Sequence, residues 1–395
     1  MTHPTLSLLL FDVDGVLIHP AGYKAAIRAT VGHFAEQMGL PDALAVYAPD
    51  EHEIAVFEAC GITNEWDSGA ICAGALLDAA LEADPALGRP TLDATLAAIR
   101  AARLALDRPD YAALARSIPH VTADPTIVPA ARYLEMLTGR GGDHLPLFAA
   151  LLGDVYGLRA PTTRVFQAYV LGSALYASVY EEPAPLEHEG CIAAYDVPLL
   201  SIDARDRLQA WRAQPGHAMV IFTARPSLPP AGAARPHGNG FSPEAELALK
   251  LLGFDAPIPL IGQGRVGWLA RQRGRNTADY TKPSPVQALA AIGAGVAGDE
   301  CAALHAAAAL VETGRLDRPL AALRDRTLSL TVFEDGIGGI RATLDAARLL
   351  QDAGVDVSAR AIGVSSHPDK RAALGAVADH VVDDVNAGLA LVWSD

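Results

Sequence analysis

The chain has 395 residues, a net charge of −15 at pH 7 and a hydrophobic content of 51%. This length and hydrophobic content suit two packed domains and exclude a largely disordered chain. The negative charge, without a run of lysine or arginine, argues against nucleic acid or an anionic membrane as the main partner.

The four cysteines form no CxxC pair, which favours core thiols in a reducing compartment over a structural zinc site. No basic region precedes the first apolar segment, so no signal peptide is expected. Asp299 and Glu300 interrupt the longest apolar stretch, residues 286–311, which therefore falls short of a membrane span. We expect a cytoplasmic protein.

Short, continuous apolar runs predict strands that are buried on both faces. They lie at residues 6–11, 219–222, 257–261, 328–333, 360–364 and 380–382. Helical patterns fall between them at residues 203–213, 243–252, 285–292, 339–351 and 369–377. The alternation predicts an α/β fold with a doubly wound, Rossmann-like parallel sheet.

Two of these helices have a serine–proline start, which predicts Ser242 and Ser284 as N-caps. Gln287 is expected to complete a capping box with Ser284.

A long, alanine-rich and almost wholly helical interval separates the first strand from the second. This pattern predicts a helical domain inserted into the sheet. We expect a catalytic core of residues 1–20 and 196–395 and an inserted cap domain of residues 21–195. The entry lies near His19 and Pro20, and the exit follows the polar stretch EEPAPLEHEG at residues 181–190.

The first strand ends in LLLFDVDGVL, which places Asp12 and Asp14 on a tight loop. In an open parallel sheet, the loops at the carboxyl ends of the strands form the binding crevice. Two carboxylates there could face one cation, or one could attack an electrophile while the other moves a proton. In isolation, an Asp-x-Asp pair is more often a turn or a helix cap.

Three further segments follow strands or begin a helix. Thr223 and Ala224 offer a hydroxyl and backbone N–H groups to phosphate oxygens. Lys282 precedes a helix within TKPSP and is one of only four lysines in the chain, which favours a specific role for its compact positive charge. Glu334 and Asp335 form an acidic pair after a strand.

The segments FDVDGVL, IFTAR, TKPSP and VFEDGIGGI resemble, in this order, the four-motif signature of the haloacid dehalogenase-like hydrolases. The resemblance covers residues 6–18 and 200–390. It implies that Asp12 is the nucleophile that becomes an aspartyl-phosphate and that Asp14 is the general acid/base. It also implies phosphoryl binding by Thr223 and Lys282.

The same resemblance implies a Mg²⁺ cofactor. Asp335, with Glu334 assisting, would hold the ion together with the nucleophile Asp12, and we include Asp14 among the expected ligands. Oxygen ligands of this kind suit Mg²⁺.

We therefore expect a Mg²⁺-dependent phosphatase that acts on a small phosphorylated metabolite and has neither nucleic-acid nor membrane partners. The resemblance implies that the inserted domain closes over the active site. A phosphomutase, or a phosphate-ligand-binding protein without turnover, remains an alternative. Phosphonate cleavage would need a lysine from the insertion, where Lys24 is the only candidate.

Two points stay open in the sequence. Asp299 and Glu300 also follow an apolar run and compete with Glu334 and Asp335, although the segment before them is more helical than strand-like. Basic side chains cluster ahead of Lys282, and such a cluster is more often a solvated face than a site for a polyanion; they are Arg265, Arg271, Arg273 and Arg275. Arg225, after the second strand, is interpreted as a solvated loop residue.

Overall fold

A computed structural model describes residues 4–119, 128–140, 144–234, 236 and 239–393. The chain divides into two compact units. The core unit contains residues 1–20 and 196–395, and the inserted unit is Ala21–Tyr195.

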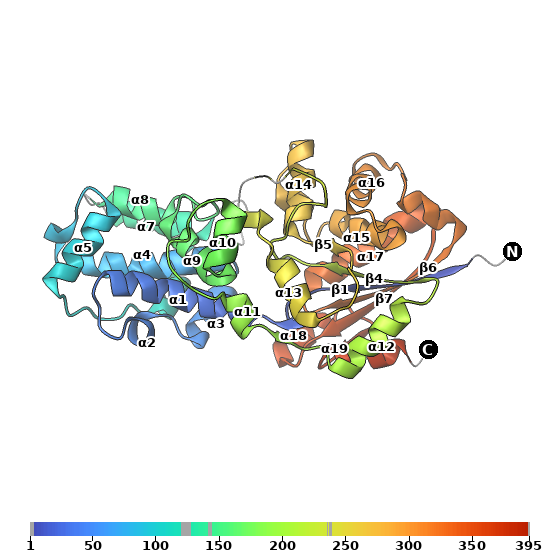
Figure 1. Cartoon of the computed structure of the whole chain (residues 1–395), viewed down its shortest axis with the longest axis horizontal. Helices are drawn as coiled ribbons and strands as arrows, with labels where there is room; N and C mark the ends of the chain where they lie inside the picture. Colours follow the sequence, from blue (N-terminus) through green and yellow to red (C-terminus); the bar gives the residue numbers. More distant parts are fainter. Residues whose placement is uncertain (1–3, 120–127, 141–143, 235, 237–238, 394–395) are drawn as a thin grey trace. The chain divides into compact units, whose positions relative to one another are not determined.

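A six-stranded parallel sheet forms the centre of the core unit, with the strand order β5-β4-β1-β6-β7-β8 (Figure 1). The strands are β1 (Thr5–Phe11), β4 (His217–Phe222), β5 (Leu260–Ile261), β6 (Thr327–Glu334), β7 (Asp356–Val364) and β8 (His380–Val382). The doubly wound parallel sheet predicted from the sequence is confirmed. Strand β5 is shorter than the expected run, and β7 is longer.

Helices cover both faces of this sheet, which explains why its strands are continuously apolar. Leu8 and Leu10 pack on one face, whereas Leu9 and Phe11 pack on the other. The first face is covered mainly by α14 (Gln263–Arg273), α15 (Pro285–Ala297), α16 (Glu300–Thr313) and α17 (Ile337–Asp352). The second is covered by α12 (Ile202–Arg212), α13 (Glu244–Leu252) and α19 (Val385–Val392). Figure 1 shows α15 and α17 on one side of the sheet and α12 and α19 on the other.

Smaller elements complete the core unit. Helix α18 (Pro368–Leu374) follows β7, and single 3₁₀ turns lie at Asn239–Phe241, Thr277–Asp279 and Leu320–Asp325. The expected cap at Ser242 is wrong. Helix α13 begins at Glu244, and the Ser242 hydroxyl donates to the Glu244 side chain at 2.7 Å instead of accepting from the helix backbone.

The order of the strands reverses beside β1. From β1 the chain builds outward through β4 to β5, then returns to place β6 on the other side of β1 and continues to β7 and β8. Such a reversal opens a crevice outside the carboxyl ends of the central strands. The segments that follow β1, β4 and β6 therefore meet at one place.

The two connections to the inserted unit leave the core unit side by side. β2 (Ile18–His19) pairs antiparallel with β3 (Val197–Pro198), so the outgoing and returning chains form a two-stranded ribbon. This ribbon begins four residues after Asp14, and Asp196 directly precedes its second strand.

The inserted unit is helical, and its described residues contain no strand. Its helices are α1 (Ala21–Gln37), α2 (Ala43–Tyr47), α3 (Glu51–Ala59), α4 (Glu65–Ala83), α5 (Leu92–Ala102), α6 (Tyr111–Ser117), α7 (Pro129–Arg140), α8 (Leu145–Leu152), α9 (Pro161–Leu171), α10 (Ser173–Tyr180) and α11 (Cys191–Tyr195), with a 3₁₀ turn at Pro85–Leu87. Helix α4 is buried along most of its length. Within the part of the chain that the structure covers, no helix is both long and apolar enough to cross a membrane.

Asp67 is a fully buried carboxyl on α4 that connects two other parts of the inserted unit. Its Oδ1 accepts a hydrogen bond from the Ala130 N–H at the start of α7 (2.8 Å), and its Oδ2 accepts one from the Tyr156 hydroxyl (2.7 Å). Burial raises the pKa of Asp67 to about 6, against these hydrogen bonds, which lower it.

The inserted unit should therefore lose stability as pH rises. A carboxyl whose pKa is raised in the folded state contributes most below its unfolded pKa of about 3.8, and this contribution is lost as pH passes 6. Relative to Asp67→Asn, the free energy of unfolding of the wild type should fall by up to about 3 kcal/mol between pH 4 and pH 7. Urea denaturation at both pH values measures this difference.

The exposed Asp107 of the same unit provides the control. Asp107→Asn should change the free energy of unfolding by less than about 0.5 kcal/mol, as substitutions of exposed side chains usually do. A difference between wild type and Asp67→Asn that stays constant from pH 4 to pH 7 would contradict the assignment to Asp67.

Candidate active site

Four segments that are distant in sequence meet at the carboxyl end of the sheet. Asp12 follows β1 directly and its N–H donates to the Phe333 carbonyl of β6 at 3.0 Å. The aromatic rings of Phe11 and Phe333 stack at a centroid distance of 4.5 Å, which ties the ends of these two strands together. Because β1 and β6 are in parallel register here, Asp12 and Glu334 emerge from neighbouring strand ends.

Three carboxyl groups and one ammonium group form the centre of this site. Oxygen atoms of Asp12, Glu334 and Asp335 lie within 4.8 Å of one another. Nζ of Lys282 lies 2.5 Å from Oε1 of Glu334 and 3.1 Å from Oδ1 of Asp12. The Lys282 side chain is only 9% exposed, so these charges interact in a largely desolvated setting.

The pKa values follow from this burial and crowding. Burial raises the pKa of Glu334, with the charge of Asp12 as the next cause and Lys282 opposing it. Burial followed by Asp12 also raises the pKa of Asp335. Burial alone would lower the pKa of Lys282, but Asp12 and Glu334 raise it, so the ammonium stays protonated. The site is thus a buried acidic cluster, in which Lys282 offsets part of the negative charge at the centre.

A second lysine binds the outer part of this cluster. Lys370 of α18 lies 2.6 Å from Oδ2 of Asp335, with its own side chain 57% exposed. The sequence interpretation missed Lys370, although the scarcity of lysine that singled out Lys282 applies equally to it.

Thr223 and Ala224 lie where the sequence placed them, directly after β4. Thr223 is buried, and its hydroxyl oxygen accepts a hydrogen bond from the Arg225 N–H at 3.2 Å. Ala224 is exposed. Their role in binding phosphate stays a prediction.

Gln287 fixes the relative positions of these segments. The expected capping box at Ser284 is wrong: Ser284 does cap α15, but the Gln287 side chain is fully buried and turns elsewhere. Its Nε2 donates to the carbonyls of Thr223 and Ile261, both at 2.9 Å. Its Oε1 accepts from the Lys282 N–H at 3.1 Å. A single amide therefore ties the lysine segment to the ends of β4 and β5.

Arg225 is not a solvated loop residue, and that interpretation is wrong. The residue is 2% exposed, and its guanidinium donates to the carboxylates of Asp14 and Asp196. Asp14 is not one of the three residues whose carboxylates group together around Lys282. That Asp14 is a metal ligand stays a prediction.

The competing acidic pair has other partners. Asp299 is the N-cap of α16, where its Oδ1 accepts from the Ala302 N–H at 2.9 Å. The Glu300 carboxylate accepts from the Leu260 N–H and from Arg265. Arg265 is itself buried and bonded to Glu246 as well, so it is no part of a solvated basic face.

Gly339 makes room for the Glu334 side chain at the start of α17. A Cβ on Gly339 would lie 1.6 Å from Oε1 of Glu334, the atom that binds Lys282. At Gly338, its neighbour in the same helix, a Cβ would lie 4.0 Å from Pro283, the nearest contact outside its chain neighbours and its own helix backbone. The two positions therefore form a matched pair.

Gly339→Ala should displace Glu334 and break its ion pair with Lys282, whereas Gly338→Ala should not. Replacing glycine by alanine in a helix contributes up to about 1 kcal/mol of helix propensity at either position. The difference between the two variants therefore isolates the effect of the clash. We expect Gly339→Ala to weaken Mg²⁺ binding by about 10-fold relative to Gly338→Ala, a loss typical of disturbed groups around a metal. Isothermal titration with Mg²⁺ measures both. Equal affinities would contradict the proposed position of Glu334 in the site.

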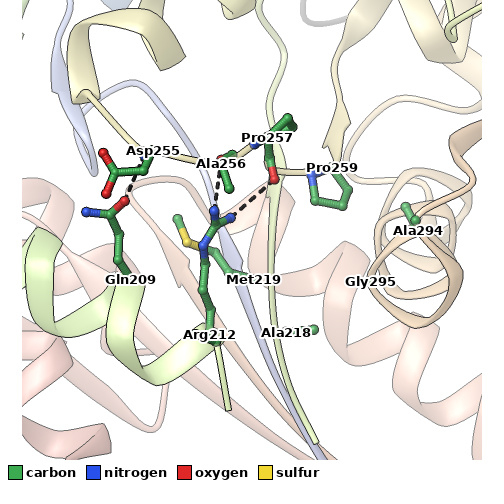
Figure 2. Close-up of a pocket in the computed structure, with 12 residues that line it drawn as sticks. Gln209, Arg212, Ala218, Met219, Asp255, Ala256, Pro257, Pro259, Ala294 and Gly295 are labelled. Carbon is green, nitrogen blue, oxygen red and sulfur yellow. Dashed lines mark hydrogen bonds between the residues drawn. The ribbon is translucent and has the colours of Figure 1, made fainter. Parts of the chain in front are cut away.

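A groove of about 440 Å³ lies elsewhere on the core unit (Figure 2). Ala218 and Met219 line it near the amino end of β4, so it opens at the opposite end of the strand from Thr223. The Arg212 guanidinium donates to the carbonyls of Ala256 and Pro257, as Figure 2 shows. The Arg212 guanidinium is thus bonded to the backbone of the protein itself.

No protein-family model and no curated protein matches this chain. Solved structures do. Target ZR25 of the Northeast Structural Genomics Consortium is similar over 97% of both chains, with 17% identity and a TM-score of 0.62, which supports a shared fold.

Two further structures align with lower scores. The phosphatase Tt82 from Thermococcus thioreducens has 15% identity and a TM-score of 0.40, covering 89% of this chain and 91% of that one. A hydrolase from Pseudomonas syringae has 12% identity and a TM-score of 0.32, covering 98% of both chains. Scores this low carry no argument about function.

The resemblance seen in the sequence rests instead on the chain's own residues. The four motifs occur in order, the insertion follows the first strand of a doubly wound sheet, and the motif side chains converge at the reversal of strand order. These features carry the sequence resemblance to the haloacid dehalogenase-like hydrolases over to the arrangement of the motif residues in the fold.

Proposed function

We propose that the chain is a Mg²⁺-dependent phosphatase that hydrolyses a small phosphorylated metabolite through an aspartyl-phosphate on Asp12. One observation carries this proposal: the Asp12 carboxylate lies between an ammonium group and two further carboxylates, at the carboxyl edge of the sheet. A nucleophile for a phosphate ester needs this kind of setting, because its negative charge must approach a negatively charged substrate.

The donor set fits Mg²⁺. Asp12, Glu334 and Asp335 provide hard oxygen atoms within 4.8 Å of one another, which is the chemistry that Mg²⁺ prefers. Burial first, and the charge of Asp12 second, raises the pKa of Glu334 and of Asp335, and a bound cation would favour the ionised form of both groups. These three residues would hold the ion, which when bound supplies positive charge to the phosphoryl oxygens.

The residues of the chain divide the reaction between them. An oxygen of Asp12 attacks phosphorus, the ester P–O bond breaks, and Asp14 donates a proton to the leaving oxygen. A water molecule then attacks the acyl phosphate while Asp14 takes its proton, the bond between phosphorus and Asp12 breaks, and phosphate leaves. Lys282 offsets the charge on the phosphoryl group throughout, and Thr223 offers it a hydroxyl.

The presence of Asp14 favours phosphoryl transfer over dehalogenation. A halide leaves without a proton, whereas an alkoxide needs one at neutral pH. The second carboxylate beside the nucleophile therefore has a purpose in ester hydrolysis that it lacks in carbon–halogen cleavage.

A substrate panel tests the proposal. Purified protein is assayed for phosphate release from an aryl phosphate and from sugar, nucleotide and polyol phosphates, with Mg²⁺ and with a chelator. We expect release that requires Mg²⁺ and that differs among the esters. Dependence on an added bisphosphate would instead favour a phosphomutase, and no release from any ester would overturn the proposal.

A further inference from the structure

Arg225 lies between two carboxylates beside the Asp12 cluster. Its Nε donates to Oδ1 of Asp14 at 2.9 Å and to Oδ2 at 3.0 Å, and its Nη2 donates to Oδ1 at 2.5 Å. The same Nη2 donates to Oδ2 of Asp196 at 2.9 Å. One guanidinium thus links the loop after β1 to the residue that precedes β3.

The burial of this guanidinium indicates that it binds other groups of the protein and not a ligand. The Arg225 side chain is 1% exposed and the Asp196 side chain 0%, whereas the Asp14 side chain is 34% exposed. Of the three, Asp14 is the one that solvent and substrate can reach. Arg225 therefore acts on the reaction only through Asp14.

An arginine fixes a carboxylate more completely than a lysine does. Its planar fork sets the orientation of the carboxylate plane as well as its distance. The backbone of the Asp14 loop is held separately, by the Gly15 N–H, which donates to the Ile18 carbonyl at 2.9 Å. Arg225 adds what this backbone contact cannot supply, which is a single orientation of the side chain.

The hydrogen bonds distinguish the two oxygens of Asp14. Among the residues that the structure describes, Oδ1 accepts from both Nε and Nη2, whereas Oδ2 accepts only from Nε, at the longer distance of 3.0 Å. The second oxygen has more of its acceptor capacity left. It is the better placed of the two to give and take a proton.

We propose that Arg225 is a positioning residue that presents Oδ2 of Asp14 to the leaving oxygen, and that Asp196 in turn holds Arg225. This inference rests on the proposed phosphatase function. It adds a role for Arg225, to which the four-motif reading gave none, and for Asp196, which lies outside the four motifs. A positioning residue can be distinguished from one that binds phosphate directly. If Arg225 acts through Asp14, the effect of replacing Arg225 must depend on how much the leaving group needs a proton.

Two substrates and three variants test the inference. The nitrophenolate group of a nitrophenyl phosphate leaves without being protonated, whereas the alkoxide group of an alkyl phosphate needs a proton from the acid. We expect Arg225→Gln to lower kcat/KM about 100-fold for the alkyl ester and less than about 3-fold for the nitrophenyl ester, within the range of general acid catalysis. Arg225→Lys should recover part of the loss, and Asp196→Asn should cost about 10-fold on the alkyl ester alone.

A double-mutant cycle with Asp14→Asn gives the second criterion. If Arg225 acts through Asp14, the double variant should be no slower than Asp14→Asn alone. Arg348→Gln, which removes an exposed ion pair with Asp345 on α17, serves as the control and should change neither ester. If Arg225→Gln does not fold, Asp196→Asn applies the same criterion while leaving the arginine in place.

The inference fails separately from the proposed function. Equal losses of kcat/KM for both esters, or losses that add to that of Asp14→Asn, would overturn the role of Arg225. The proposed phosphatase function would still stand as long as the wild type releases phosphate. A wild type that releases no phosphate from either ester would overturn both.

Discussion

Asp12→Asn is expected to lower phosphate release by at least about 10⁴-fold, because an amide cannot replace the carboxylate as nucleophile. The substitution nearly preserves shape, and Lys282 keeps its 2.5 Å ion pair with Glu334. The variant should therefore stay folded. Phosphate release and circular dichroism measured on the same preparations separate lost chemistry from lost structure.

Asp299→Asn provides the matched control for this prediction. It alters the acidic pair that competes in the sequence, and asparagine is as good a helix cap as aspartate. We expect full Mg²⁺-dependent activity in this variant. Comparable losses in Asp12→Asn and Asp299→Asn would contradict the assignment of the nucleophile.

Lys282→Met should have the second large effect, on both stability and turnover. It removes the ammonium from between Asp12 and Glu334, whose side chains are 11% and 2% exposed. Leaving buried charge unpaired typically costs about 3 to 5 kcal/mol. Loss of a cation at a transferring phosphoryl group costs on the order of 10³ to 10⁵ in rate. Urea denaturation and phosphate release measure the two effects.

Glu334→Gln separates these effects. In the double variant with Lys282→Met, one unpaired carboxylate becomes neutral, so most of the lost stability should return. Activity should not return, because the phosphoryl group still lacks its ammonium and the proposed Mg²⁺ site has also lost the Glu334 carboxylate. A double variant that regains turnover would show that Lys282 serves the fold and not the reaction.

The sheet was predictable where its strands are continuously apolar. Residues 6–11 and 328–333 lie in the two central strands, within one or two residues of the ends of β1 and β6. The run 257–261 was overestimated because Pro257 and Pro259 cannot donate to a strand ladder, so β5 begins at Leu260. Strand β7 was underestimated because its first half alternates polar and apolar residues.

The motif carboxylates were predictable for a local reason. Each follows a strand directly, and a parallel sheet brings the ends of its strands together. Arg225 and Gln287 were misread because their partners are far away in sequence: 211 residues separate Arg225 from Asp14, and 64 separate Gln287 from Thr223. A polar residue that is buried by distant partners leaves no periodic signal along the chain.

Gln287 illustrates the difference between a local rule and a tertiary contact. Its position after Ser284-Pro285 satisfies the pattern for a capping box, and Ser284 does cap the helix. Two buried carbonyls and one backbone N–H offer the amide three partners instead. Burying these groups unsatisfied would cost more than a capping contact contributes.

The central claim is that Asp12 carries the phosphoryl group during turnover. The most direct measurement is to quench the protein in acid while it turns over an alkyl phosphate with Mg²⁺, digest it, and locate any phosphoryl group by mass spectrometry. We predict a single acid-stable, hydroxylamine-sensitive phosphoryl group on Asp12. With nitrophenyl phosphate, whose leaving group needs no proton, this group should accumulate further in Asp14→Asn, because hydrolysis still needs the base. Turnover without any phosphorylated Asp12, or with the phosphoryl group on another residue, would contradict this account.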